Sequence, residues 1–169
     1  RVFRRLVVSP PKTGERLDWL VEKAVEIGVD EIVCIETRRA ERDKINLERL
    51  EKIAISAMKQ SKQVYLPTIR GMVKWKQFLT ETYEGAKYIA AVQTDVNRRQ
   101  LSVISCQSSV VSPPSSFTIL IGPEGDFTPE EATALQNNKW KPFCLGKSIL
   151  RTETAGIAVC HGLHLLNSD

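Results

Sequence analysis

Two short segments in the last third of the sequence hold the residues best suited to chemistry. The first is residues 121–127 (Ile-Gly-Pro-Glu-Gly-Asp-Phe), and the second is residues 145–155 (Leu-Gly-Lys-Ser-Ile-Leu-Arg-Thr-Glu-Thr-Ala). The glycines of the first segment allow the backbone to approach a ligand and to offer it N–H and C=O groups. This segment lacks the Lys-Ser/Thr that ends a P-loop and the glycine spacing of a dinucleotide fold. We therefore expect it to bind a neutral or zwitterionic ligand.

The second segment adds charged, polar and apolar side chains where a helix is expected to begin. Arg151 and Glu153 alternate with two threonines, directly after Ile149 and Leu150. Apolar side chains in a loop need burial, so we expect these two to wall an adenine. Taken alone, a Gly-Pro-x-Gly turn is more often structural, and the second segment could be a capped helix start with exposed ions. Together, the two segments predict two walls of one pocket.

Apolar patterns predict the elements that position these segments. Short apolar or β-branched runs predict strands at residues 1–8, 31–35, 66–70, 88–92, 117–121 and 142–145. Helical spacing predicts helices at residues 17–25, 47–58, 75–79 and 152–166, with a further helix beginning at the capping box of Thr128 and Glu131. Gly28 is expected to end the first helix and Asn46 to cap the second.

The alternation of strands and helices predicts an α/β fold, with a mostly parallel sheet covered by helices on both faces. In such sheets the ligand lies in the crevice at the carboxyl ends of the strands. Both segments follow predicted strands, so we expect them to meet at that edge.

Length and composition bound the class of protein. The 169 residues fit one domain, 42% are hydrophobic and 26% charged, and no apolar run is long enough to span a bilayer. The chain begins with Arg1 and shows no signal peptide, so we expect a cytoplasmic protein and a fragment whose upstream part has been removed. The four cysteines are scattered singly and the two histidines lack nearby ligands, so we expect reduced thiols and no metal.

Basic residues cluster at three places in a chain whose net charge is +4. Arg4 and Arg5 lie at the start, Arg39 follows the second predicted strand, and Lys59 and Lys62 end the second predicted helix. One such cluster is more often a solvated face, but three together favour contact with phosphates. We predict phosphate contacts for all five side chains.

The paired segments resemble the signature of the SPOUT-class methyltransferases, and specifically of the ribosomal RNA small subunit methyltransferase E family. The resemblance continues in residues 12–28 (Lys-Thr-Gly-Glu-Arg-Leu-Asp-Trp-Leu-Val-Glu-Lys-Ala-Val-Glu-Ile-Gly) and 52–61 (Lys-Ile-Ala-Ile-Ser-Ala-Met-Lys-Gln-Ser), so it covers almost the whole chain. Enzymes of that family use S-adenosyl-L-methionine to methylate N3 of a uridine in 16S small-subunit rRNA. The resemblance implies this activity, cofactor and substrate here.

The resemblance also implies an architecture that periodicity does not predict. Residues 1–169 would form one SPOUT methyltransferase domain, with a C-terminal trefoil knot made when the end of the chain threads a preceding loop. It implies a homodimer through the knot region and a β-barrel RNA-binding domain upstream that is absent from this chain. The residues expected to bind the cofactor are Ile121, Gly122, Pro123, Glu124, Gly125, Leu145, Gly146, Ile149, Leu150, Arg151 and Thr154.

Methyl transfer requires the protein to position donor and acceptor and to manage the acceptor's proton. Arg151 is the first candidate to stabilise the negative charge that spreads onto the uracil oxygens, and Arg39 is the second. Glu124 and Glu153 are candidate bases, although each could instead cap a loop N–H. The five basic residues named above would contact the RNA.

The sequence departs from the family pattern at three positions. The family usually has glycine where this chain has Asp126, and often has arginine near Ser148 and near Gln63. Asp126 removes backbone freedom and adds a carboxylate, and the other two changes remove possible phosphate contacts. Two alternatives stay open: a SPOUT enzyme that methylates a ribose 2′-hydroxyl or a guanine, and a non-catalytic RNA-binding module with a vestigial pocket.

Overall fold

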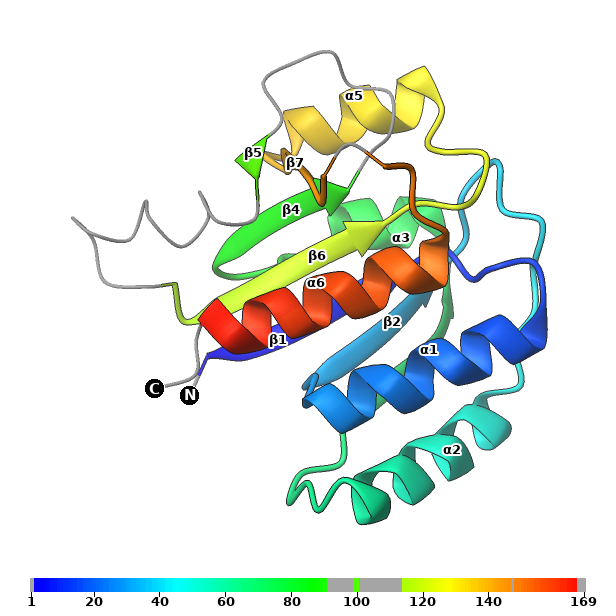
Figure 1. Cartoon of the computed structure of the whole chain (residues 1–169). Coiled ribbons are helices and arrows are strands. Elements are labelled where there is room, and N and C mark those ends of the chain that lie inside the picture. The colour runs from blue at the N-terminus through cyan, green and yellow to red at the C-terminus, as the bar shows by residue number, and fades with distance from the viewer. Residues whose placement is uncertain (1, 91–98, 101–113, 147, 167–169) are drawn as a thin grey trace.

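The protein is a parallel sheet with helices on both faces (Figure 1). The computed structural model describes residues 2–90, 99–100, 114–146 and 148–166. Its strands are β1 (Phe3–Val8), β2 (Glu31–Ile35), β3 (Thr68–Val73), β4 (Ala86–Ala90), β5 (Arg99–Gln100), β6 (Ser116–Ile121) and β7 (Lys141–Cys144). Its helices are α1 (Gly14–Ile27), α2 (Leu47–Gln60), α3 (Trp75–Thr80), α5 (Pro129–Asn137) and α6 (Thr152–Leu166).

The seven strands lie in the order β3-β2-β1-β6-β4-β7-β5, and every neighbouring pair is parallel. The central strands are therefore β1, β6 and β4, which are distant in the sequence. All six residues of β6 are buried, as expected for a strand covered on both faces. The predicted α/β fold with a parallel sheet and helices is confirmed.

Two apolar layers hold the helices to the sheet. On one face α1 and α6 pack together, and α2 packs on the outer side of α1, while α3 and α5 cover part of the other face (Figure 1). The strand β1 supplies both layers, since Leu6 and Val8 point to the α1 and α6 side and Val7 to the α3 and α5 side. This alternation follows from the two-residue period of a strand.

Local signals set the helix boundaries as predicted. Gly28 has φ 101° and ends α1, and the side chain of Asn46 accepts a hydrogen bond from the backbone N–H of Arg49 at the start of α2. Thr128 and Glu131 form the predicted capping box of α5. Gly28 thus fixes where α1 ends, and Asn46 and Thr128 fix where α2 and α5 begin. These positions also bound the loops that join the helices to the strands.

Strand boundaries depart from the predictions in three places. The strand β3 begins only at Thr68. The apolar side chains of Val64 to Leu66 are exposed and do not pack against the core, so this run does not belong to the strand. The fourth strand is Ala86–Ala90, and residues 91 and 92 of the predicted strand lie outside the described residues. The two-residue strand β5 had no sequence signal. Arg1 and Cys106 also lie outside the described ranges.

Candidate functional site

A cavity of about 290 Å³ lies at the carboxyl ends of β6, β4 and β7, beside the start of α6. Its position is the one expected for a ligand site in an open parallel sheet. Both predicted segments contribute to it. The lining residues are Ala90, Ile121, Gly122, Pro123, Glu124, Asp126, Phe143, Cys144, Leu145, Gly146, Ser148, Ile149, Leu150, Arg151, Thr152 and Ala155.

The loop after β6 forms one wall through a tight turn. The backbone N–H of Asp126 donates to the carbonyl of Pro123 at 2.9 Å, and Asp126 has φ 58°. Its carboxylate accepts from the backbone N–H of Phe127 at 2.9 Å. Aspartate is among the few residues other than glycine that adopt this left-handed conformation readily. The structure thus explains how the chain tolerates a residue that departs from the family's usual glycine.

Gly122 lies where the loop is narrowest. A Cβ atom on it would stand 2.8 Å from the ring of Phe127, so a larger side chain would force the ring or the loop to move. The hydroxyl of Thr152, at the start of α6, donates to the Gly122 carbonyl at 3.1 Å. This bond ties the two walls of the cavity together.

The cavity combines an apolar interior with polar groups at its mouth. Phe143, Ile121 and Ala155 are buried, and the exposed side chains of Glu124 and Arg151 stand among the lining residues. The carboxylate of Glu124 accepts from the backbone N–H of Lys12 at 3.1 Å, as in the capping alternative raised for it. The site therefore offers apolar surface, backbone groups and charges of both signs.

The side chain of Ile149 is 79% exposed, so the described residues do not bury it, and its expected contact with an adenine stays a prediction. Leu150 is half-buried. Both line the cavity, yet no other part of the described chain covers Ile149. Its surface is available to a ligand or to another chain.

Three predicted site residues do not line this cavity. Gly125 is turned toward Arg39 on the other side of its loop. Thr154 and Glu153 line a neighbouring groove beside α1, and the two spaces share residues 149–151 in their linings. Glu153 is 5% exposed, and its carboxylate lies 3.6 Å from the Arg16 guanidinium.

Seven residues of the cavity were missed by the sequence predictions. Thr152 and Ala155 line the cavity because they lie on the face of α6 that is turned toward it. The sequence does not indicate which face of this helix is turned toward the cavity. Ala90 and two residues of β7 line the cavity because β4 and β7 end beside β6, and this order of strands has no sequence signal. The missed residues are Ala90, Asp126, Phe143, Cys144, Ser148, Thr152 and Ala155.

Of the five predicted phosphate contacts, only Arg39 lies beside this cavity. Its guanidinium donates to the Gly125 carbonyl at 2.9 Å. Lys59 and Lys62 are exposed at the end of α2, next to the start of β3, and so lie at the amino edge of the sheet. Arg4 and Arg5 lie near the start of β1, at the same edge. The structure does not bring these four residues to the cavity.

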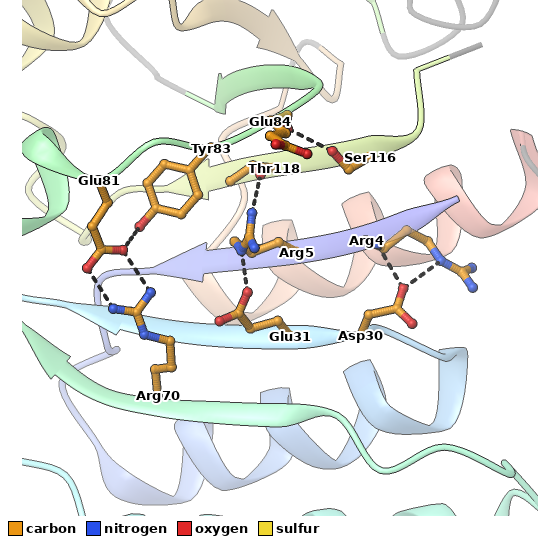
Figure 2. A network of polar contacts seen from close by, with 10 residues as sticks. All are labelled: Arg4, Arg5, Asp30, Glu31, Arg70, Glu81, Tyr83, Glu84, Ser116 and Thr118. Carbon is orange, nitrogen blue, oxygen red and sulfur yellow. Dashed lines mark hydrogen bonds and ion pairs between the residues drawn. The ribbon is translucent and has the colours of Figure 1, made fainter. Parts of the chain in front are cut away.

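Arg4 and Arg5 belong to a polar network at this amino edge (Figure 2). Arg5 donates to the Glu31 carboxylate and, at 3.1 Å, to the Thr118 hydroxyl, and its guanidinium carbon lies 4.9 Å from the Tyr83 ring. Arg4 donates through its backbone N–H to Asp30 and through its side chain to Nδ1 of His164. Both arginines are thus engaged inside the domain.

A second pair completes the network. Arg70 makes two hydrogen bonds to the Glu81 carboxylate, at 2.6 and 2.8 Å, and the Tyr83 hydroxyl donates to the same carboxylate at 2.8 Å (Figure 2). The hydrogen bonds from Arg70 lower the pKa of Glu81 to about 2. Burial, followed by the bond to Glu81, raises the pKa of Tyr83. These groups satisfy one another and leave no open ligand site.

The thiols differ in their surroundings. Burial raises the pKa of Cys34 and of Cys160 to about 12, whereas Cys144 is half-buried and lines the cavity. Within the described residues there is no group of three metal-binding side chains and no helix long and apolar enough to cross a membrane.

Comparisons with known proteins agree with this geometry. The family model for the RNA methyltransferase domain matches residues 4–164. The ribosomal RNA small subunit methyltransferase E of Rickettsia conorii is 31% identical over 91% of this chain and 61% of its own length. Relatives of this kind are longer, and the chain spans about three fifths of that protein.

Solved structures give the same result. The probable rRNA-methyltransferase of Porphyromonas gingivalis is 41% identical, with a TM-score of 0.85 over 98% of this chain and 68% of its own. The ribosomal RNA small subunit methyltransferase E of Neisseria gonorrhoeae, solved with S-adenosyl methionine bound, is 26% identical, with a TM-score of 0.80 over 98% of this chain and 66% of its own.

Proposed function

Because the chain belongs to the RNA methyltransferase domain family, we propose that it transfers a methyl group from S-adenosyl-L-methionine to 16S small-subunit rRNA. The observation that carries this proposal is the cavity at the carboxyl edge, which both predicted segments line. Two of the similar solved proteins contain the same cofactor.

The residues present fit this cofactor. Its adenine suits the apolar side chains of Leu145, Ile149 and Leu150, and its zwitterionic amino acid part suits the backbone N–H and C=O groups of the loop after β6. The bond from Thr152 to Gly122 holds the walls in place before the ligand binds. When bound, the cofactor supplies an electrophilic methyl group on a sulfonium.

We propose N3 of a uridine as the acceptor. Its proton must leave, and the negative charge that results spreads onto two carbonyl oxygens, which Arg151 at the mouth of the cavity can stabilise. Glu124 is the better-placed proton acceptor, because it lines the cavity, whereas Glu153 is buried against Arg16 in the neighbouring groove. Gly125 and Thr154 do not line the cavity, and the proposal gives them no contact with the cofactor.

A C-terminal trefoil knot and a homodimer through it are part of the proposal. In support of the knot, β7 lies between β4 and β5, although it follows both in the chain, and the chain then returns to place α6 against β1 and α1. In support of the dimer, Ile149 and Trp19 are exposed along the groove between α1 and α6. In that groove the Oε2 atom of Glu153 has no hydrogen-bond partner among the described residues.

We further propose a β-barrel RNA-binding domain upstream of residue 1 and a cytoplasmic location, where ribosomal subunits assemble. The support is that the chain spans 61% and 68% of the lengths of the two bacterial methyltransferases from Rickettsia conorii and Bacillus subtilis. Activity then depends on RNA contacts from both domains.

Calorimetry with S-adenosylhomocysteine and a methylation assay on small-subunit rRNA test the proposal. We expect binding of the nucleoside, and 3-methyluridine in mass spectra of the digested rRNA. A 2′-O-methyl nucleoside or a methylguanosine would replace the proposed acceptor with another. Absence of nucleoside binding by the folded protein would leave only a non-catalytic RNA-binding module.

A further inference from the structure

A second cavity, of about 510 Å³, lies behind the loop that forms the cofactor wall. It opens at the carboxyl ends of β2 and β3 and the start of α5, on the sheet face that α3 and α5 cover (Figure 1). Asp126 lines the first cavity and Thr128 lines the second, so residues 122–128 separate the two. The methyl-transfer site proposed above has no role for this space.

The second cavity has cations whose charge is available. The side chains of Arg38 and Lys76 are exposed, and neither has a hydrogen bond or a close ion pair in the part of the chain that the structure describes. Arg38 does lie near Glu130, whose pKa is lowered first by a hydrogen bond from its own backbone N–H and further by the charge of Arg38. Lys74 pairs with Glu36 at 2.6 Å, but both are open to solvent, with side-chain exposures of 75% and 39%. Such a surface pair is worth little and exchanges readily for another partner.

An aromatic ring forms the fixed part of the cavity wall. The ring of Trp75 packs 5.7 Å from that of Phe78 and 6.3 Å from that of Phe127, centre to centre. Phe127 belongs to the loop that separates the cavities, so a single aromatic layer links Trp75 to the wall of the cofactor site. A base that rests on Trp75 would therefore lie close to the one that is methylated.

The buried carboxylate of Glu131 connects the segment that carries Arg38 to the loop that separates the cavities. Glu131 accepts from the backbone N–H of Arg38 at 2.8 Å through one oxygen, and from the backbone N–H of Thr128 at 2.9 Å through the other. It joins the loop after β2 to the loop after β6 without occupying the cavity mouth. Arg38 is thus held by its backbone, while its side chain stays available.

We propose that this second cavity binds a nucleotide of the RNA substrate that neighbours the methylated one, with its base on Trp75 and its phosphates on Arg38 and Lys76. The combination of an aromatic wall with exposed cations is how proteins hold unstacked RNA. Glu36 and Glu130, also at the cavity, provide acceptors for the N–H groups of a base edge. The inference rests on the proposed function, since it specifies where a nucleotide next to the methylated one in the same RNA would bind.

Charge reversal tests the cations. We expect the double variant Arg38→Glu with Lys76→Glu to weaken binding of small-subunit rRNA at least tenfold and to reduce its salt slope by about two. The matched control is Lys141→Glu, since Lys141 is also exposed but begins β7 at the amino edge. S-adenosylhomocysteine affinity should stay unchanged in both. Unchanged rRNA affinity in the double variant, with that cofactor site intact, would overturn the inference.

Crosslinking tests the aromatic wall without changing the protein. Small-subunit rRNA that carries 4-thiouridine is irradiated with the wild-type chain, and the crosslinked peptides are sequenced. We expect a crosslink in α3 at Trp75, and crosslinks confined to other elements would contradict the inference. If the wild-type chain does not bind S-adenosylhomocysteine, the proposed function itself fails, which is a different result from loss of rRNA binding in the double variant alone.

Discussion

At the amino ends of the strands Arg5 and Arg70 are each paired with a carboxylate (Figure 2), whereas at the carboxyl ends Arg38 and Arg151 line cavities. The residue types are the same at both edges. At the amino edge their side chains lie over the strands, and their charges are satisfied by neighbouring carboxylates (Figure 2). At the carboxyl edge they stand on loops, where a ligand can be their partner.

The comparison teaches that the position of a charge on a parallel sheet decides its use. A strand enters the sheet at its amino end, where its polar side chains lie over the sheet face beside those of its neighbours. At its carboxyl end the chain leaves the sheet in a loop that has room to fold back around a ligand. The changes below test the contrast between the two edges.

The largest expected effect is at the amino edge, where Arg5→Ala leaves the Glu31 carboxylate buried without its main partner. We expect the free energy of unfolding to fall by about 3 kcal/mol. Arg38→Ala, at the carboxyl edge, should change it by less than about 0.5 kcal/mol. Urea unfolding of both variants measures the difference, and equal effects would remove the distinction between the edges.

The next effect is on catalysis at the carboxyl edge. Arg151→Ala should lower kcat/KM for rRNA methylation about 100-fold, because the charge that develops on the uracil loses its stabilising cation. Its stability should match that of the wild type, since the side chain is exposed. Steady-state kinetics and thermal unfolding provide the two readouts. A stability loss as large as that of Arg5→Ala would show that Arg151 is structural.

A smaller effect is expected from the bond that joins the two cavity walls. Thr152→Val leaves the buried carbonyl of Gly122 without its donor, and should weaken S-adenosylhomocysteine binding about tenfold. Thr154→Val, two residues further along α6, should leave the affinity within about twofold, as expected for a surface change. Calorimetry compares them directly, and equal losses would contradict the helical phase seen in the structure.

The smallest expected effect is the loss of stability at low pH. Arg70 holds the pKa of Glu81 at about 2, below its usual 4.5, so the stability that this pair contributes is present above pH 4.5 and is lost as the pH falls toward 2. Because both side chains are partly exposed, we expect a loss of only about 1 kcal/mol. Urea unfolding between pH 6 and pH 3 should show a shallower decline for Glu81→Gln than for the wild type. Parallel declines would mean that the pair contributes nothing.

The fold was predictable from the sequence because its signals are local. The capping box at Thr128, the αL glycine Gly28 and the apolar periods each depend on a few adjacent residues. The order of the strands depends on contacts between distant segments, so the sequence did not indicate that β4 and β7 would flank the site. For that reason Ala90 and Cys144 were missed as cavity residues.

The sequence predicted which two loops form the site, but not the direction in which each of their side chains points. Glycines and apolar residues pointed to two loops that line the cavity in the structure. The structure places Thr152 in that lining and the predicted Thr154 in the neighbouring groove, because one or two helix residues shift a side chain to another face. The charge clusters gave no information on which edge they would occupy. The sequence places Arg5 and Arg39 in similar basic clusters. Only the sheet shows that Arg5 pairs with a carboxylate at the amino edge and that Arg39 lies beside the cavity at the carboxyl edge.

The position of β1 at the centre of the sheet also determines when the protein can acquire its site. One neighbour of β1 is β6, so Phe3 pairs with Ser116, and during synthesis one side of β1 stays without a partner until most of the chain has been made. Such distant pairing makes folding slow. Because α6 supplies one wall of the cavity, a nascent chain cannot complete this site until α6 has left the ribosome.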